Sequence, residues 1–167
     1  GDFSGTTIVA SNNFTLDGSK AATGQVAITT VSAGGNSTIS MGSGTGSLAV
    51  TTAIAAGNIT LDAGNFGGTI DMANISASGN LTISIGSKGD FSGLDIRTDS
   101  NFTLDASNAS TGSITIGGLS ALGNASIVMG AGTGGVALTG ANSGDIGGTF
   151  TLDGSNFGGT IDLDTIS

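Results

Sequence analysis

The four residues Phe14-Thr15-Leu16-Asp17 return as Ile59-Thr60-Leu61-Asp62, Phe102-Thr103-Leu104-Asp105 and Phe150-Thr151-Leu152-Asp153. Three looser copies lie between them, namely Ser37-Thr38-Ile39-Ser40, Leu81-Thr82-Ile83-Ser84 and Ala125-Ser126-Ile127-Val128. The motif therefore recurs about every 22 residues. A repeat of this length is typical of solenoids, in which each coil buries its apolar face against its neighbours.

Each copy of the motif alternates in the way that a half-buried strand does, with Phe14, Leu16 and Gly18 on one face and Thr15 and Asp17 on the other. A glycine-rich turn and a second strand follow. We expect the inward residues of the second strands to be Val26/Ile28, Leu48/Val50, Ile70/Met72, Leu94/Ile96, Ile114/Ile116, Val136/Leu138 and Ile161/Leu163. A single apolar residue then marks a short third strand in most coils, at Val31, Ile54, Ile75, Leu119 and Ile166.

These strands predict an all-β fold, a parallel β-solenoid of about seven and a half coils. The general preference of parallel crossovers predicts a right-handed coil. Gly1-Asp2-Phe3-Ser4-Gly5, which we interpret as a turn, recurs at 89–93, and segment 59–76 matches 150–167 at 12 of 18 positions. We therefore expect one domain over 1–167, built from four-coil super-repeats at 1–88 and 89–167, the second incomplete.

The inward positions alternate in size from coil to coil. Phe14 is followed at the third inward position by Gly18, whereas Ser37 in the next coil is followed by Met41. Stacked at a strand spacing of ~4.8 Å, each large side chain would lie over a small one. Glycines stand two residues before most second-strand pairs, at Gly24, Gly46, Gly68, Gly112, Gly134 and Gly159. They suggest a backbone conformation that only glycine adopts cheaply.

The composition excludes several classes of protein. The net charge is −9, from 12 Asp residues against Lys20, Lys88 and Arg97, so there is no basic surface for nucleic acid. A chain that is 37% hydrophobic and 9% charged is not typical of disorder. The chain has no His, Cys or Glu, and its Asp residues repeat in register instead of converging at one place. We therefore predict that it is not an enzyme.

Two rows of polar residues each have two interpretations. The threonines at 15, 38, 60, 82, 103 and 151, with Ser126, are either ordinary exposed strand residues or a face that orders water as ice. The asparagines at 13, 36, 58, 80, 101 and 124 each begin an Asn-X-Ser/Thr triplet. They are either glycosylation sites or a structural ladder in which each side chain hydrogen-bonds the next coil.

Asp71 and Asp95 are the candidate metal ligands. The expected pairs Ile70/Met72 and Leu94/Ile96 would place both carboxylates at the same outward position of adjacent coils. Two carboxylates ~4.8 Å apart repel unless a cation or Arg97 lies between them, and calcium favours such oxygen ligands. The alternative is plain surface charge.

Three runs of sequence, at 79–84 (Gly-Asn-Leu-Thr-Ile-Ser), 104–108 (Leu-Asp-Ala-Ser-Asn) and 67–71 (Gly-Gly-Thr-Ile-Asp), carry a resemblance. They resemble the β-strand repeats of giant bacterial surface proteins, including filamentous-haemagglutinin-like adhesins, calcium-associated adhesins and S-layer proteins. The resemblance implies a secreted stalk, filament or lattice module at the cell surface.

The alternative function is a module whose Thr/Asp face binds ice, glycan or a host surface. Neither end of the sequence carries a usual edge-blocking feature, so we expect the solenoid to continue, into further repeats or by head-to-tail stacking with itself. No run of residues is apolar enough to span a membrane.

Overall fold

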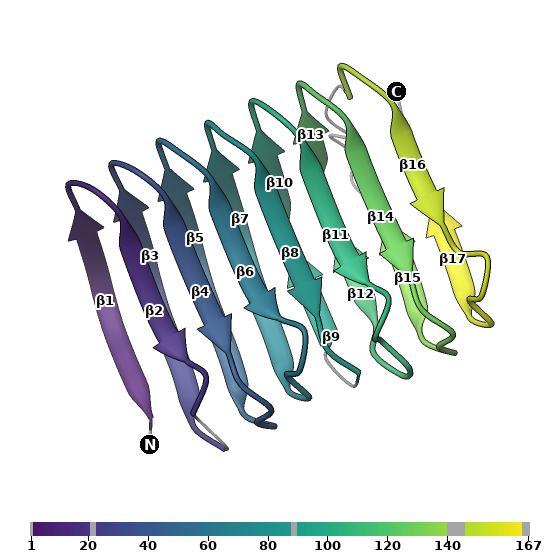
Figure 1. Cartoon of the computed structure of the whole chain (residues 1–167), viewed down its shortest axis with the longest axis horizontal. Coiled ribbons are helices and arrows are strands. Elements are labelled where there is room, and N and C mark those ends of the chain that lie inside the picture. The colour runs from purple at the N-terminus through teal and green to yellow at the C-terminus, as the bar shows by residue number, and fades with distance from the viewer. Residues whose placement is uncertain (1, 21–22, 88–89, 140–145, 165–167) are drawn as a thin grey trace.

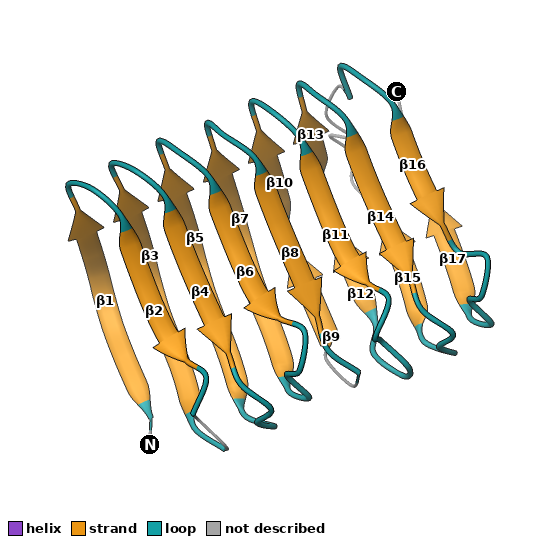
Figure 2. Ribbon diagram, in the orientation of Figure 1, coloured by secondary structure: helices purple, strands orange, loops and turns teal. Residues whose placement is uncertain are grey.

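The protein is a parallel β-solenoid of about seven coils, as a computed structural model shows (Figure 1). The structure describes residues 2–20, 23–87, 90–139 and 146–164. Within these residues only strands, turns and loops occur, with no helix (Figure 2). The all-β parallel fold predicted from the repeat is therefore confirmed. The super-repeat boundary at 88/89 and the predicted third-strand residue Ile166 lie outside the described residues.

The repeated Thr-containing motif forms one face of the solenoid, a seven-stranded parallel sheet with the order β16-β14-β11-β8-β6-β4-β2. Its strands are β2 (Phe14–Gly18), β4 (Ser37–Met41), β6 (Ile59–Ala63), β8 (Leu81–Ile85), β11 (Phe102–Ala106), β14 (Ala125–Met129) and β16 (Phe150–Asp153). Each strand alternates inward and outward as the sequence predicts, so its apolar residues reach the core.

The other sheet contains ten strands and follows the order β1-β3-β5-β7-β9-β12-β15-β17. Four of its strands are long: β1 (Phe3–Ala10), β3 (Gln25–Ala33), β5 (Ser47–Ala55) and β7 (Thr69–Ala77). Six are short: β9 (Asp90–Gly93), β10 (Asp95–Thr98), β12 (Ile114–Ile116), β13 (Leu119–Ala121), β15 (Gly135–Leu138) and β17 (Thr160–Leu163). In the early coils, the predicted second and third strands are one continuous strand. In two later coils they are separate strands, β9 followed by β10 and β12 followed by β13.

A bend in each long strand explains this division. In β3, Ile28 and Val31 are both buried, so the two residues between them, Thr29 and Thr30, both lie on the outside. This breaks the alternation of an extended strand and turns the chain from one face of the solenoid to the next. The bend also shifts the inward phase in β5, where Ala53 is buried and Ile54 is 45% exposed. Ile54, the apolar residue expected to mark the third strand of this coil, therefore lies on the outside, and Ala53 takes the inward position.

The register of the second strands confirms six of the seven predicted inward pairs. Val26 and Ile28 lie beside Leu48 and Val50, and the same columns continue to Val136 and Leu138. The seventh pair, Leu94/Ile96, was wrong at Leu94 and in its register, because the residues beside Ile114 and Ile116 are Phe91 and Gly93 and Leu94 is 66% exposed. Ile96 is buried as predicted, but it lies beside Ile75 and Leu119. Residues Asp90–Gly93 of the second Gly-Asp-Phe-Ser-Gly run form β9, and Phe3 to Gly5 of the first run begin β1, so these residues do not form the expected turn.

The stacked core alternates large and small side chains as expected at the third inward position, whereas at the first position the large residues Ile59, Leu81 and Phe102 follow one another. Phe102, 1% exposed, lies between Leu81 and Ala125, and Gly18 lies beside Met41. The structure adds Phe66, a fully buried ring that the sequence analysis did not identify. Its N–H donates to the Ala63 carbonyl at 2.9 Å, so the loop after β6 turns back and places the ring in the core.

The glycines before the second strands are required by space and not by backbone angle. None of the described glycines has a positive φ. A Cβ on Gly46 would lie 1.9 Å from the Gly24 carbonyl oxygen, and one on Gly134 would lie 1.8 Å from the Gly112 carbonyl oxygen. Successive coils therefore approach too closely at this corner for any side chain, which corrects the conformational explanation given above.

Candidate functional site

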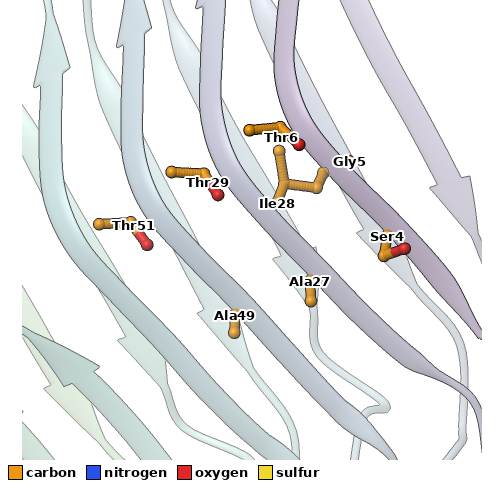
Figure 3. A pocket seen from close by; sticks show the side chains of 8 residues that line it. All are labelled: Ser4, Gly5, Thr6, Ala27, Ile28, Thr29, Ala49 and Thr51. Atoms are coloured by element: carbon orange, nitrogen blue, oxygen red, sulfur yellow. The ribbon is translucent and has the colours of Figure 1, made fainter.

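The bend of the first three coils forms an open groove on the outer surface, and this is the first candidate site (Figure 3). Its volume is about 340 Å³. It is lined by Ser4, Gly5, Thr6, Ala27, Ile28, Thr29, Ala49 and Thr51. Figure 3 shows the three threonines in one row and Ser4, Ala27 and Ala49 in a second. The groove exists because the residues of the second row are small.

The chemistry of this groove is limited to hydrogen bonding. Thr6, Thr29 and Thr51 contribute hydroxyls, and none of the eight lining residues carries a charge. The next residue in the second row is Asp71, which lies beside Ala49. The groove can therefore hold water or a neutral polar group, but its lining has no group that titrates near neutral pH.

Asp71 and Asp95, the predicted calcium ligands, do not lie beside each other. Asp71 pairs with Ser92, and Asp95 pairs with Asn74, three residues further along β7 than Asp71. At ~3.3 Å per residue this is a separation of roughly 10 Å along the strand, too far for one ion to bind both carboxylates directly. The expected alignment was wrong because the inward pair of the second strand in that coil starts at Phe91, in β9, and not at Leu94.

Asp95 instead pairs with Arg97 on the same face of β10. The Arg97 Nη2 lies 3.1 Å from the Asp95 Oδ2, and Arg97 Nε donates to both carboxylate oxygens at 3.1 Å. The hydrogen bond from Arg97 to Asp95, with the charge of that carboxylate, raises the pKa of the guanidinium. Within the described residues, no group of three or more His, Cys, Asp or Glu side chains is placed to hold a metal ion.

The aspartates of the repeated motif accept hydrogen bonds from the backbone of the turns that follow them. The Asp17 Oδ1 accepts the Ser19 N–H at 2.9 Å, and the Asp153 Oδ1 accepts the Ser155 N–H at 3.1 Å. This is an Asx-turn, in which the side chain bonds the backbone two residues on. Hydrogen bonds from the Ser19 hydroxyl and N–H lower the pKa of the Asp17 carboxyl, and those from the Ser155 N–H and hydroxyl lower that of Asp153.

The asparagines form the predicted structural ladder. The Asn36 Oδ1 accepts the N–H of Asn58 at 2.8 Å, and the Asn58 Oδ1 accepts the N–H of Asn80 at 2.8 Å. The same bond joins each successive coil from Asn13 to Thr149. Glycine precedes most of these asparagines because a Cβ at Gly57 would lie 2.4 Å from the Asn36 Oδ1. This Gly-Asn pair is a feature that the sequence analysis did not recognise as one unit.

The threonine row is continuous across the sheet of β2 to β16. Thr15 lies beside Thr38, Thr60 lies beside Thr82, and the row continues through Ser126 to Thr151. The neighbouring outward row alternates Asp and Ser as far as Asp105. The predicted Thr/Asp face therefore exists as a surface, and the register shows two parallel rows of hydroxyls and carboxylates on it.

Comparisons of the chain with protein-family models, curated proteins and solved structures gave no match. The described residues include no helix long and apolar enough to cross a membrane.

Proposed function

We propose that the chain is a structural module of a secreted bacterial cell-surface or extracellular protein, such as a filament, adhesin or S-layer protein. In this role it is a stiff stalk or a lattice unit, and it works without catalysis or a cofactor. The three runs of sequence that resemble surface-protein repeats support this location. The apolar columns and the Asn ladder repeat from coil to coil, and this repetition supports the mechanical role.

The observation that carries the proposal is the continuity of the core and of the Asn ladder. The apolar columns run from coil to coil. The Asn ladder joins each coil to the next, because each Asn side chain accepts a hydrogen bond from a backbone N–H of the following coil. Such a stack gains stability from each neighbouring coil and behaves as a one-dimensional array. A catalytic site would need side chains that converge at one place, whereas these side chains repeat along the axis.

Immunogold labelling of intact cells of the source organism tests this proposal. Antibodies raised against the folded chain are expected to label the outside of the cell, on fibres or a surface layer. Antibodies against an internal enzyme serve as the control for broken cells. Label found only after the cells are opened would overturn the proposal.

The continuous Thr/Asp face favours a second candidate, a module that binds ice, glycan or a host surface. Thr60→Lys with Thr82→Lys would place two long charged side chains in the middle of the row. If the face binds a ligand, this double variant should lose ice-recrystallisation inhibition or glycan-array binding while its thermal melt is unchanged. Equal signals from the wild type and the variant would exclude this face.

A further inference from the structure

A small hollow on the outside of the solenoid spans three consecutive coils, at β5, β7 and β10. Its volume is about 120 Å³. Further strands pair on both sides of it, β3 with β5 and β13 with β10. It belongs to the ten-stranded sheet, so it is separate from the Thr/Asp face on the sheet of β2 to β16. The outward side chains that line it form two rows, Thr52, Asn74 and Asp95 in one and Ile54, Ser76 and Arg97 in the other.

The hollow exists because the second of these rows places a small side chain between two large ones. Ser76 lies beside Ile54 of the preceding coil and beside Arg97 of the following coil. At ~4.8 Å per coil the two large side chains stand roughly 9.6 Å apart. Ile54 is 45% exposed and the Arg97 side chain is 63% exposed, so both project from the surface. The result is a slot with one apolar wall and one charged wall.

The charged wall still has hydrogen-bonding groups to offer a ligand. The Nε and Nη2 groups of Arg97 face the Asp95 carboxylate at 3.1 Å. A guanidinium has five N–H groups and a carboxylate has about four lone-pair sites, so N–H donors on Nη1 and an acceptor site on the Asp95 Oδ1 remain. The Asn74 Nδ2 donates to the Thr51 carbonyl at 3.2 Å, which holds the amide in place. Ser76 adds a hydroxyl, which both donates and accepts.

Asp95 and Arg97 interrupt the repetition of the outer surface. Arg97 is the chain's only arginine, and its contact with Asp95 is the one ion pair among the residues that the structure describes. In the same outward row Ser32 also lies between two large side chains, Val9 and Ile54, but neither of them is charged. A feature that departs from the repeat of such an array is expected to serve binding and not stacking.

The groups in the slot select the chemical class of the ligand. An anion would meet the Asp95 carboxylate and a net charge of −9, whereas a cation would meet Arg97. A wholly apolar group would cover the ion pair without returning its lost hydrogen bonds to water. A neutral ring with hydroxyls at its edge and C–H groups on its face matches both walls, because hydroxyls donate and accept and the C–H face can pack against Ile54.

We propose that this slot binds one neutral sugar ring of a glycan. Neighbouring hydroxyls of the sugar accept from the Arg97 Nη1 and donate to the Asp95 Oδ1, while Asn74 and Ser76 bind from the floor of the slot. The C–H face of the ring packs against Ile54. This glycan site depends neither on the proposed structural role nor on the Thr/Asp face.

NMR titration of the folded chain tests the site, with the methyl glycosides of glucose, galactose and mannose as probes. At least one of them is expected to bind and to shift the backbone amide signals of Asn74, Ser76 and Arg97 most. Arg97→Gln and Asp95→Asn should each weaken that binding about tenfold or more, because each removes a charged hydrogen-bonding group.

Matched variants outside the hollow serve as controls. Lys20→Gln and Asp71→Asn make the same two changes of charge at other places and should bind the sugar as wild type does. The double variant Thr60→Lys with Thr82→Lys alters only the Thr/Asp face and should also keep the binding. Circular dichroism confirms that all the variants fold.

Four results would overturn the proposal. None of the three glycosides binds, methyl glucuronide binds more tightly than methyl glucoside, Arg97→Gln and Asp95→Asn bind as wild type does, or binding is lost only in the double variant of the Thr/Asp face. The second result would make the slot an anion site, and the last would assign the sugar to the other sheet. None of them alters the labelling test of the structural role.

Discussion

At the scale of single residues, asparagine accepts the hydrogen bond that recurs in every coil, whereas aspartate accepts hydrogen bonds that recur only at longer intervals. The Asn ladder makes one bond per coil, at a spacing of ~4.8 Å where stacked charges would repel strongly. Asp2 and Asp90 also accept an N–H from the next coil, from Gln25 at 3.0 Å and Ser113 at 2.7 Å. These two carboxylates are four coils apart, so their repulsion is screened.

The turn aspartates predict a pH dependence of stability. Asp17 and Asp153 have a folded-state pKa below the ordinary 3.8, so their ionised forms stabilise the fold above that value. This contribution is lost as the pH falls through the lower folded-state pKa. Asp17→Asn with Asp153→Asn keeps the side-chain acceptor but cannot bind the proton.

We expect wild type to exceed this double variant in melting temperature at neutral pH. The difference should shrink as the pH falls below the ordinary pKa of 3.8 and through the lower folded-state pKa. A difference that does not change over this range would contradict the assignment.

Two buried hydroxyls predict opposite results. The Ser37 Oγ is buried without a hydrogen-bond partner, whereas the Thr98 hydroxyl donates to the Gly79 carbonyl and accepts the Ser100 N–H. Ser37→Ala should therefore keep or raise the free energy of unfolding. Thr98→Val should lower it by about 1–3 kcal/mol, because it leaves two backbone groups unpaired. Urea melts of both variants decide, and a clear loss in Ser37→Ala would mean that this hydroxyl has a partner.

At the scale of the strands and corners, close approach of successive coils decides which residues are tolerated. Gly134 and Gly135 are adjacent in sequence, but a Cβ on Gly134 would lie 1.8 Å from the Gly112 carbonyl oxygen, and one on Gly135 would meet nothing within 4 Å. Gly134→Ala should destabilise the fold by about 1–3 kcal/mol or more through overpacking. Gly135→Ala should be neutral or stabilising by up to about 1 kcal/mol. Equal thermal melts would show that the corner can widen.

Core stacking predicts a large effect at Phe102. The ring is 1% exposed and lies beside Leu81 and Ala125 of the adjacent coils. Phe102→Ala should cost about 3–5 kcal/mol in the free energy of unfolding, because it removes the ring and leaves a cavity. Val9→Ala, at a side chain 73% exposed, should change it little. If denaturant melts of Phe102→Ala and wild type coincide, the inward orientation is wrong.

At the scale of the whole molecule, the separation of Asp71 and Asp95 predicts that calcium does not hold the coils together. Asp71 lies beside Ser92, and Asp95 is paired with Arg97 at 3.1 Å. Melting temperatures with a chelator and with excess calcium should therefore coincide. A rise with calcium that Asp71→Asn or Asp95→Asn abolishes would reinstate the site that the sequence suggested.

The sequence alone determined the coil length, the inward columns of the strands from β2 to β16, six of the seven second-strand pairs and the two outward rows. These follow from a period of about 22 residues combined with strict alternation, because each coil must bury its apolar face against the next. The Asn ladder was predictable for the same reason, since one residue type at one corner of every coil is expected to contact its own copies.

Only the tertiary structure decided the places where volume or space is shared between coils. In β9, Phe91 and Gly93 stand where the other coils have two aliphatic residues. The side chains of Phe91 and Ile96 fill the space beside Gly93, since a Cβ there would lie 3.3 Å from the Phe91 ring and 2.7 Å from the Ile96 Cδ1. The apolar pattern of the sequence does not reveal this exchange of volume between residues. Leu94 was therefore predicted to point inward, and Asp95 was predicted to lie beside Asp71. The bend that exposes Ile54 and the corner that excludes a Cβ at Gly46 likewise depend on the neighbouring coil, which the local sequence does not contain.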